Sequence, residues 1–145
     1  MRGVALGLGA VLIATAAWAH QGVKDPDVQA RMHLMMQVKG AMGSLGKMAN
    51  GAEPFDASRA AAAKAELARY AGQILNAFEK PATDPKSEAL STIWVSFPDF
   101  AQRAVNMNAA FLALDTSSLE ALRAGLADAG GTCTSCHKSY RMETN

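Results

Sequence analysis

The chain has 145 residues, which is the length of one ordinary domain. Half of the residues are hydrophobic but only 6% are aromatic, so a core would rest on aliphatic side chains and methionine. The formal net charge is only +1, whereas nucleic-acid-binding proteins carry a clustered excess of lysine and arginine. The composition therefore indicates one globular domain and argues against a nucleic acid as its partner.

Residues 1–19 are predicted to be a secretory signal peptide. Arg2 is followed by an apolar run from Val4 to Ala17, and the Ala-Trp-Ala sequence that ends at Ala19 matches a cleavage site. The alternative is a membrane anchor, but a spanning helix needs about 20 apolar residues, more than this run supplies. Cleavage after Ala19 would leave residues 20–145 as a formally neutral periplasmic domain with no membrane anchor.

Two helices are predicted in the first half of the exported chain. Asp25-Pro26 is a helix start, and the first helix runs to about Met48 before Asn50-Gly51 ends it. The second spans 57 to about 78 and begins behind Asp56, which is a good N-cap residue.

Two more helices are predicted in the second half. After a proline-bounded linker at 81–85 and a looser stretch, the third helix runs from Pro98 to about Leu114. A capping box at 117–120 begins a fourth, which continues to about Arg141. The expected fold is all-α, an antiparallel up-down-up-down four-helix bundle. The alternative is a three-helix arrangement with an irregular middle.

The strongest functional signal is the sequence Cys-Thr-Ser-Cys-His at residues 133–137. The pattern C-x-x-C-H is the attachment signature of a c-type haem. The two thiols add to the two vinyl groups of the haem, and the histidine becomes the proximal ligand of its iron. On a helix, Cys133, Cys136 and His137 share one face. We therefore expect one covalently attached haem c in the core of the bundle.

Three other interpretations of the cysteines compete with haem. A disulfide suits an exported protein. A redox dithiol of the thioredoxin kind belongs in a βαβ unit, and the sequence has no strand pattern. Zinc needs about four ligands, and His20 and His33 do not complete a set with the usual spacing.

Methionines in the first helix supply candidates for the second axial position on the iron. Five of the eight methionines lie between residues 32 and 48. Thioethers suit haem iron, although methionine is also a flexible core filler. The inward face is predicted to carry Met35 near its middle, with His33 on the opposite, solvated side. Its residues recur every seven positions in two rows: Val28, Met35, Met42 and Ala49, and Arg31, Val38 and Leu45. Met35 is therefore the predicted distal ligand.

Two features have alternative explanations that the sequence leaves open. Arg31 lies on the inward seam, where a guanidinium needs an anion, so it either contacts a haem propionate or extends to the surface. Gly130-Gly131 is unusual inside a helix, and the missing side chains either let the macrocycle lie close to the backbone or kink the helix.

The chain resembles the class II c-type cytochromes, the cytochrome c-prime family, over essentially all of residues 20–145. The resemblance rests on the C-x-x-C-H motif, on Ser139-Tyr140-Arg141 after it, on Arg31-x-x-x-Met35, on residues 51–56, and on Ile93-Trp94. The motif's position near the C-terminus separates this family from the commoner class I cytochromes, which carry it near the N-terminus. Met32 departs from the family, which often has glutamine there.

The resemblance implies thioether bonds at Cys133 and Cys136 and proximal ligation by His137. Met35 occupies the distal position, which ligates the iron in low-spin members and does not in five-coordinate, high-spin members that bind NO or CO. The stretch from Met35 to Asp56 looks most like the low-spin branch. Many relatives are homodimers through the first two helices, and the outer side of the first helix here carries Met36, Gly40 and Gly43.

We therefore expect an electron carrier that cycles between Fe(III) and Fe(II), with His137 and Met35 as axial ligands and periplasmic redox proteins as partners. No catalytic acid, base or nucleophile is visible, so an enzyme is not expected. One alternative is a five-coordinate cytochrome c-prime that binds NO or CO while Met35 does not ligate. The other is a haem-free, disulfide-bonded helical protein that binds a partner.

Overall fold

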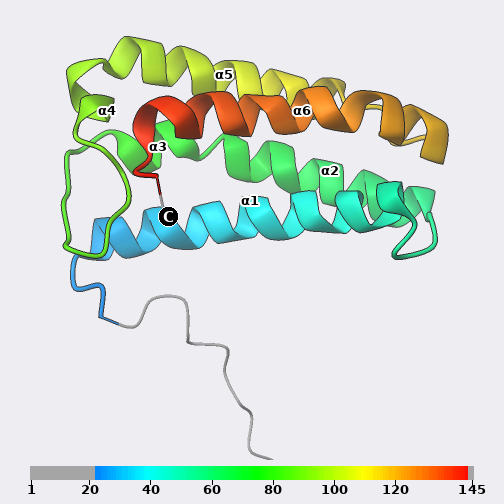
Figure 1. The fold of residues 1–145 in the computed structure, drawn as a ribbon, viewed down its shortest axis with the longest axis horizontal. Helices are drawn as coiled ribbons and strands as arrows, with labels where there is room; N and C mark the ends of the chain where they lie inside the picture. The colour runs from blue at the N-terminus through cyan, green and yellow to red at the C-terminus, as the bar shows by residue number, and fades with distance from the viewer. Residues whose placement is uncertain (1–21, 144–145) are drawn as a thin grey trace, which may run out of the picture.

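A computed structural model describes residues 22–143, so the predicted signal peptide and His20 lie outside the described residues. Four long helices, α1 (Pro26–Asn50), α2 (Ala57–Ala71), α5 (Phe97–Ala113) and α6 (Leu119–Tyr140), form the bundle. They run in alternating directions along one axis (Figure 1). Two short helices, α3 (Ile74–Phe78) and α4 (Thr92–Val95), lie at one end. The predicted four-helix bundle is confirmed, and the three-helix alternative is wrong.

The predicted helix boundaries at α1 and α2 follow from capping side chains. The Asp25 carboxylate accepts hydrogen bonds from the backbone N–H groups of Asp27 and Val28. Gly51 ends α1 with a φ of 82°, a left-handed conformation that favours glycine. The Asp56 carboxylate caps α2 by accepting from the Arg59 N–H at 2.8 Å.

Two boundaries differ from the prediction. The second predicted helix is interrupted at 72–73, where Gly72 and Gln73 donate to Ala68 and Tyr70 and form a turn between α2 and α3. Glycine is a weak helix former, so this interruption costs little. The fourth helix is capped by Ser118 instead of Ser117, because the Ser118 hydroxyl accepts from the Ala121 N–H.

The inward face of α1 is shifted slightly from the predicted seam. Val28, Arg31, Val38 and Leu45 are buried as predicted. The other three buried positions on α1 are one residue earlier than predicted: Leu34, Ala41 and Met48. Met35 and Met42 are partly buried and pack beside that core. Among the residues that the structure describes, no helix is long and apolar enough to cross a membrane.

Candidate functional site

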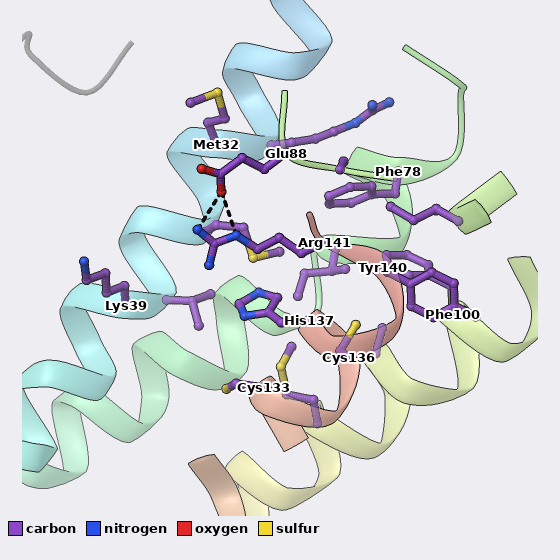
Figure 2. A pocket seen from close by; sticks show the side chains of 18 of the residues that line it. Met32, Lys39, Phe78, Glu88, Phe100, Cys133, Cys136, His137, Tyr140 and Arg141 are labelled. Carbon is purple, nitrogen blue, oxygen red and sulfur yellow. Dashed lines mark hydrogen bonds and ion pairs between the residues drawn. The ribbon is translucent and has the colours of Figure 1, made fainter. Parts of the chain in front are cut away.

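A cavity of about 660 Å³ opens between α1, α5 and α6 at the end of the bundle where α3 and α4 lie. Its lining is mainly apolar, with contributions from Met35, Phe78, Phe100 and Met107. Cavities of this size and character are typical of cofactor sites. Figure 2 shows the side chains that line it.

The last turns of α6 bring the motif residues to this cavity. Cys133, Cys136 and His137 all line it, as the helical spacing predicts. Both cysteines are half-buried free thiols, so the described structure has no disulfide between them. Burial raises the pKa of both thiols, with Arg103 opposing the shift at Cys136.

His137 lines the cavity from the last turns of α6 and is partly exposed to solvent. Burial of the ring lowers its pKa, the nearby Arg141 guanidinium lowers it further, and Glu88 acts in the opposite direction. These influences favour the neutral imidazole, which is the form that binds a metal ion.

Met35 lines the same cavity from α1, together with Met32, Met36 and Met42. The structure therefore brings the predicted distal residue, the two cysteines and His137 together in one place. His33 lies on the exposed side of α1, as predicted.

The buried Arg31 has partners that the sequence did not predict. Its side chain is 3% exposed, so it does not extend to the surface. It donates to the carbonyl oxygens of Ala77 at 2.7 Å, Ala82 at 3.2 Å and Lys80, all at or after the end of α3. Burial is the main cause that lowers the pKa of Arg31. The three backbone carbonyls satisfy the Arg31 guanidinium, so its burial does not require a haem propionate as a partner. A contact between Arg31 and a propionate stays a prediction.

The Arg31 guanidinium also contacts two aromatic rings. Its central carbon lies 4.9 Å from the ring centre of Phe78 and 5.1 Å from that of Trp94. The Trp94 indole N–H donates to the Phe78 carbonyl at 2.9 Å. Cation–π contact adds to the hydrogen bonds, so Arg31 joins α1 to both short helices.

The two glycines in α6 do not contact the cavity. Neither Gly130 nor Gly131 lines it, and a Cβ added at either would meet nothing within 4 Å. The helix continues through both positions. The idea that these glycines let the macrocycle approach the backbone gains no support from the structure.

A polar network that the sequence did not predict holds the motif against α5. Arg103 donates to Asp99 at 2.7 Å and to the Ser135 hydroxyl at 2.8 Å. The buried Tyr140 donates its O–H to Asp99 at 2.6 Å. The bonds from Tyr140 and Arg103 lower the pKa of the Asp99 carboxyl. Only the spacing of Asp99 and Arg103 by four residues could have suggested part of this network.

The segment between α3 and α4 also reaches the cavity. Ser87, Glu88 and Ala89 line it, and so does Arg141 after the end of α6. Nothing in the sequence assigned a role to the linker residues, because their position depends on contacts with the distant C-terminal residues.

These residues fit a haem c. Two thiols and an imidazole face one apolar cavity, as covalent attachment and proximal ligation require. The cavity walls also carry Lys39, a cation that suits a haem propionate, while the nearby Arg103 and Arg141 are ion-paired with Asp99 and Glu88. The described residues contain no group of three or more histidine, cysteine or acidic side chains placed to hold a metal ion directly.

The chain is similar to cytochromes over most of its length. The family model described as Cytochrome C′ matches residues 27–141. A cytochrome c-556 from Agrobacterium tumefaciens (strain B2A) is 35% identical over 123 residues, which cover 81% of this chain and 98% of the relative. A cytochrome c-554 from Cereibacter sphaeroides is 32% identical and covers 96% of both chains. The crystal structure of cytochrome c′ from Rubrivivax gelatinosus superposes with a TM-score of 0.70 at 28% identity, covering 79% and 94%.

Proposed function

The chain belongs to the cytochrome c′ family and carries one covalently attached haem c, and from this premise we propose that it is a periplasmic carrier of single electrons. Cys133 and Cys136 hold the haem through thioether bonds. His137 and Met35 are its axial ligands. The haem supplies a reversible change between Fe(III) and Fe(II), and the chain's own residues hold it and shape its surroundings.

The observation that carries this proposal is the placement of Met35. It lines the cavity from α1, while His137 and both cysteines line it from α6. A thioether and an imidazole presented from two different helices suit the two sides of one macrocycle, and His/Met ligation is an arrangement of electron-transfer cytochromes. The match to relatives named cytochrome c-556 and c-554 supports the low-spin branch.

The other cavity residues favour electron transfer over acid–base chemistry. Phe78, Phe100 and Met107 surround the site with apolar surface, which limits solvent access and thereby influences the reduction potential. The proposed role needs no general acid, base or nucleophile from the chain. A redox protein of the same compartment would be the partner that delivers or accepts the electron.

The absorption spectra of the ferric and ferrous protein, with and without CO, test the ligation. We expect low-spin spectra and no ready CO uptake by the wild type. Met35→Leu should convert the iron to a high-spin form that binds CO. Met42→Leu is the matched control, because Met42 also lines the cavity from α1 and should leave the spectra unchanged. A high-spin wild type that takes up CO would instead support the five-coordinate alternative that binds NO or CO.

Export and assembly are separate parts of the proposal. Signal peptidase cleavage after Ala19 would give a mature chain that begins at His20, and N-terminal sequencing of periplasmic protein tests this. Gly40 is exposed on α1, where it would permit close approach of a second copy, whereas the exposed Met36 and Gly43 also line the cavity. Sedimentation of Gly40→Glu against wild type tests the homodimer, since a bulky charge there should produce monomers.

A further inference from the structure

A segment that we call the strap, residues 79–91, forms one wall of the cavity. Arg31 holds its first part through the carbonyls of Lys80 and Ala82. In its middle, the Asp84 carboxylate accepts from the backbone N–H groups of Lys24 at 2.8 Å and Asp25 at 3.2 Å. The strap is therefore fixed to the start of α1 at both places.

The last part of the strap pairs with the chain after α6. The Leu90 N–H donates to the Tyr140 carbonyl at 3.0 Å, and the Met142 N–H donates to the Glu88 carbonyl at 2.8 Å. Ala89 and Arg141 form an antiparallel bridge between these two bonds. This backbone pairing fixes Glu88 opposite Arg141.

The Glu88 and Arg141 side chains form an ion pair at the cavity. Arg141 Nε lies 2.6 Å from Glu88 Oε2, and the Arg141 terminal nitrogen lies 2.5 Å from the same oxygen. Figure 2 shows the Arg141 guanidinium between the Glu88 carboxylate and the His137 ring in that view. Arg141 follows His137 by one helical turn and donates its backbone N–H to the His137 carbonyl at 3.0 Å. The cation is thus held beside the proximal histidine, with the anion behind it.

We propose that the Glu88–Arg141 pair sets the reduction potential of the haem, with Glu88 acting through Arg141 as a positioning residue. This inference rests on the proposed function, because it assumes that His137 ligates an iron that gains and loses one electron. Fe(III) carries one more positive charge than Fe(II), so a nearby cation favours the reduced form and a nearby anion favours the oxidised form. Glu88 partly neutralises Arg141 and also keeps it in place.

Charge-removing variants of the two partners should act in opposite directions. Glu88→Gln leaves Arg141 uncompensated, so the ratio of reduced to oxidised protein at a fixed potential should rise, on the order of threefold for partly exposed charges. Arg141→Gln leaves Glu88 uncompensated, so this ratio should fall by a similar factor. The double variant should lie nearer to wild type than either single variant. Glu88→Asp keeps the charge and should restore most of the wild-type ratio.

The three charged residues that pair at the other end of α1 offer a matched control. Glu53 accepts from Arg59 at 2.6 Å and from Lys47 at 3.2 Å, and none of these residues lines the cavity. Glu53→Gln should therefore leave the reduction potential unchanged. Potentiometric titration followed by the haem absorption spectrum measures all the variants and the wild type.

Opposite shifts in the two single variants would not result from a general loss of structure, which would move both variants the same way. Shifts of the same sign, or shifts no larger than that of Glu53→Gln, would overturn the inference. A wild type that lacks covalent haem or does not titrate reversibly by one electron would instead contradict the proposed function. The two failures are therefore distinguishable in the same experiment.

Discussion

The two ends of the bundle consist of the same four long helices but are filled differently. At the end with the α1–α2 and α5–α6 turns, side chains fill the interior: Leu45, Phe111 and Leu122 are all 0% exposed. At the other end the helices surround the cavity, and the strap closes one of its sides.

The packed end of the bundle mainly provides stability, whereas the cavity end provides the residues for haem binding. The packed end gains stability from the burial of apolar surface. The cavity end depends more on polar tethers, notably Arg31 to the strap and Arg103 and Tyr140 to Asp99. Substitutions at the packed end should therefore lower the free energy of unfolding, whereas substitutions at the cavity end should mainly change haem attachment or the strap.

Loss of both cysteines should have the largest effect, and only on the cavity end. In the double variant Cys133→Ala, Cys136→Ala, no thiol remains to add to the haem, so the exported protein should lack the covalent haem mass entirely. Mass spectrometry of the denatured protein measures this. Ser135→Ala, between the cysteines, should keep the haem. A covalent haem in the double variant would show that the attachment site lies elsewhere.

Substitution in the packed end should change stability and leave the haem in place. Phe111→Ala creates a cavity among fully buried side chains and should lower the free energy of unfolding by about 3 to 5 kcal/mol. Denaturant unfolding of the haem-containing protein measures it. The control is Leu112→Ala, because that neighbouring side chain is 58% exposed. Equal losses from both variants would argue against a solid core at this end.

Removal of the Arg31 tether should test the strap specifically. Arg31→Met keeps an apolar stem but leaves the carbonyls of Ala77, Lys80 and Ala82 without their donor, which should cost about 2 to 4 kcal/mol of unfolding free energy. Amide hydrogen exchange should accelerate in the strap before it does in the packed end. Arg69→Met removes an exposed arginine from α2 and serves as the control. Unchanged exchange in the strap would contradict the tether.

The smallest expected effect is a change in how the stability of the folded protein depends on acidic pH, through Asp99 at the α5–α6 contact. Tyr140 and Arg103 lower the pKa of Asp99 in the folded protein. The ionised carboxylate therefore contributes stability above its unfolded pKa of about 3.9, and this contribution is lost as the pH falls through the lower folded value. Asp99→Asn should show a smaller loss of stability between about pH 5 and 3 than wild type. Glu66→Gln, exposed on α2, should retain the wild-type dependence.

Local sequence signals predicted the features that depend on local chemistry. Caps at Asp25 and Asp56 and the turn at Gly51 determine where helices start and stop, and each is visible within a few residues. The C-x-x-C-H spacing likewise places its three side chains on one helical face wherever that helix lies.

Features that depend on distant residues were not predictable in the same way. For Arg31 the sequence leaves a haem propionate or the surface open, because no sequence pattern indicates that carbonyls 46 to 51 positions away will surround it. Glu88 lies in a linker with no periodicity, and its partner Arg141 is 53 residues later. Only the folded chain brings these groups together.

The pairing of the strap with the chain after α6 has a consequence for the order of synthesis. The chain is made from its N-terminus, so Glu88, Ala89 and Leu90 exist long before Tyr140 and Met142, their backbone partners. Cys133 and Cys136 are also complete before those partners are. The wall of the cavity on the strap side therefore cannot form until residues beyond the two attachment thiols have been made.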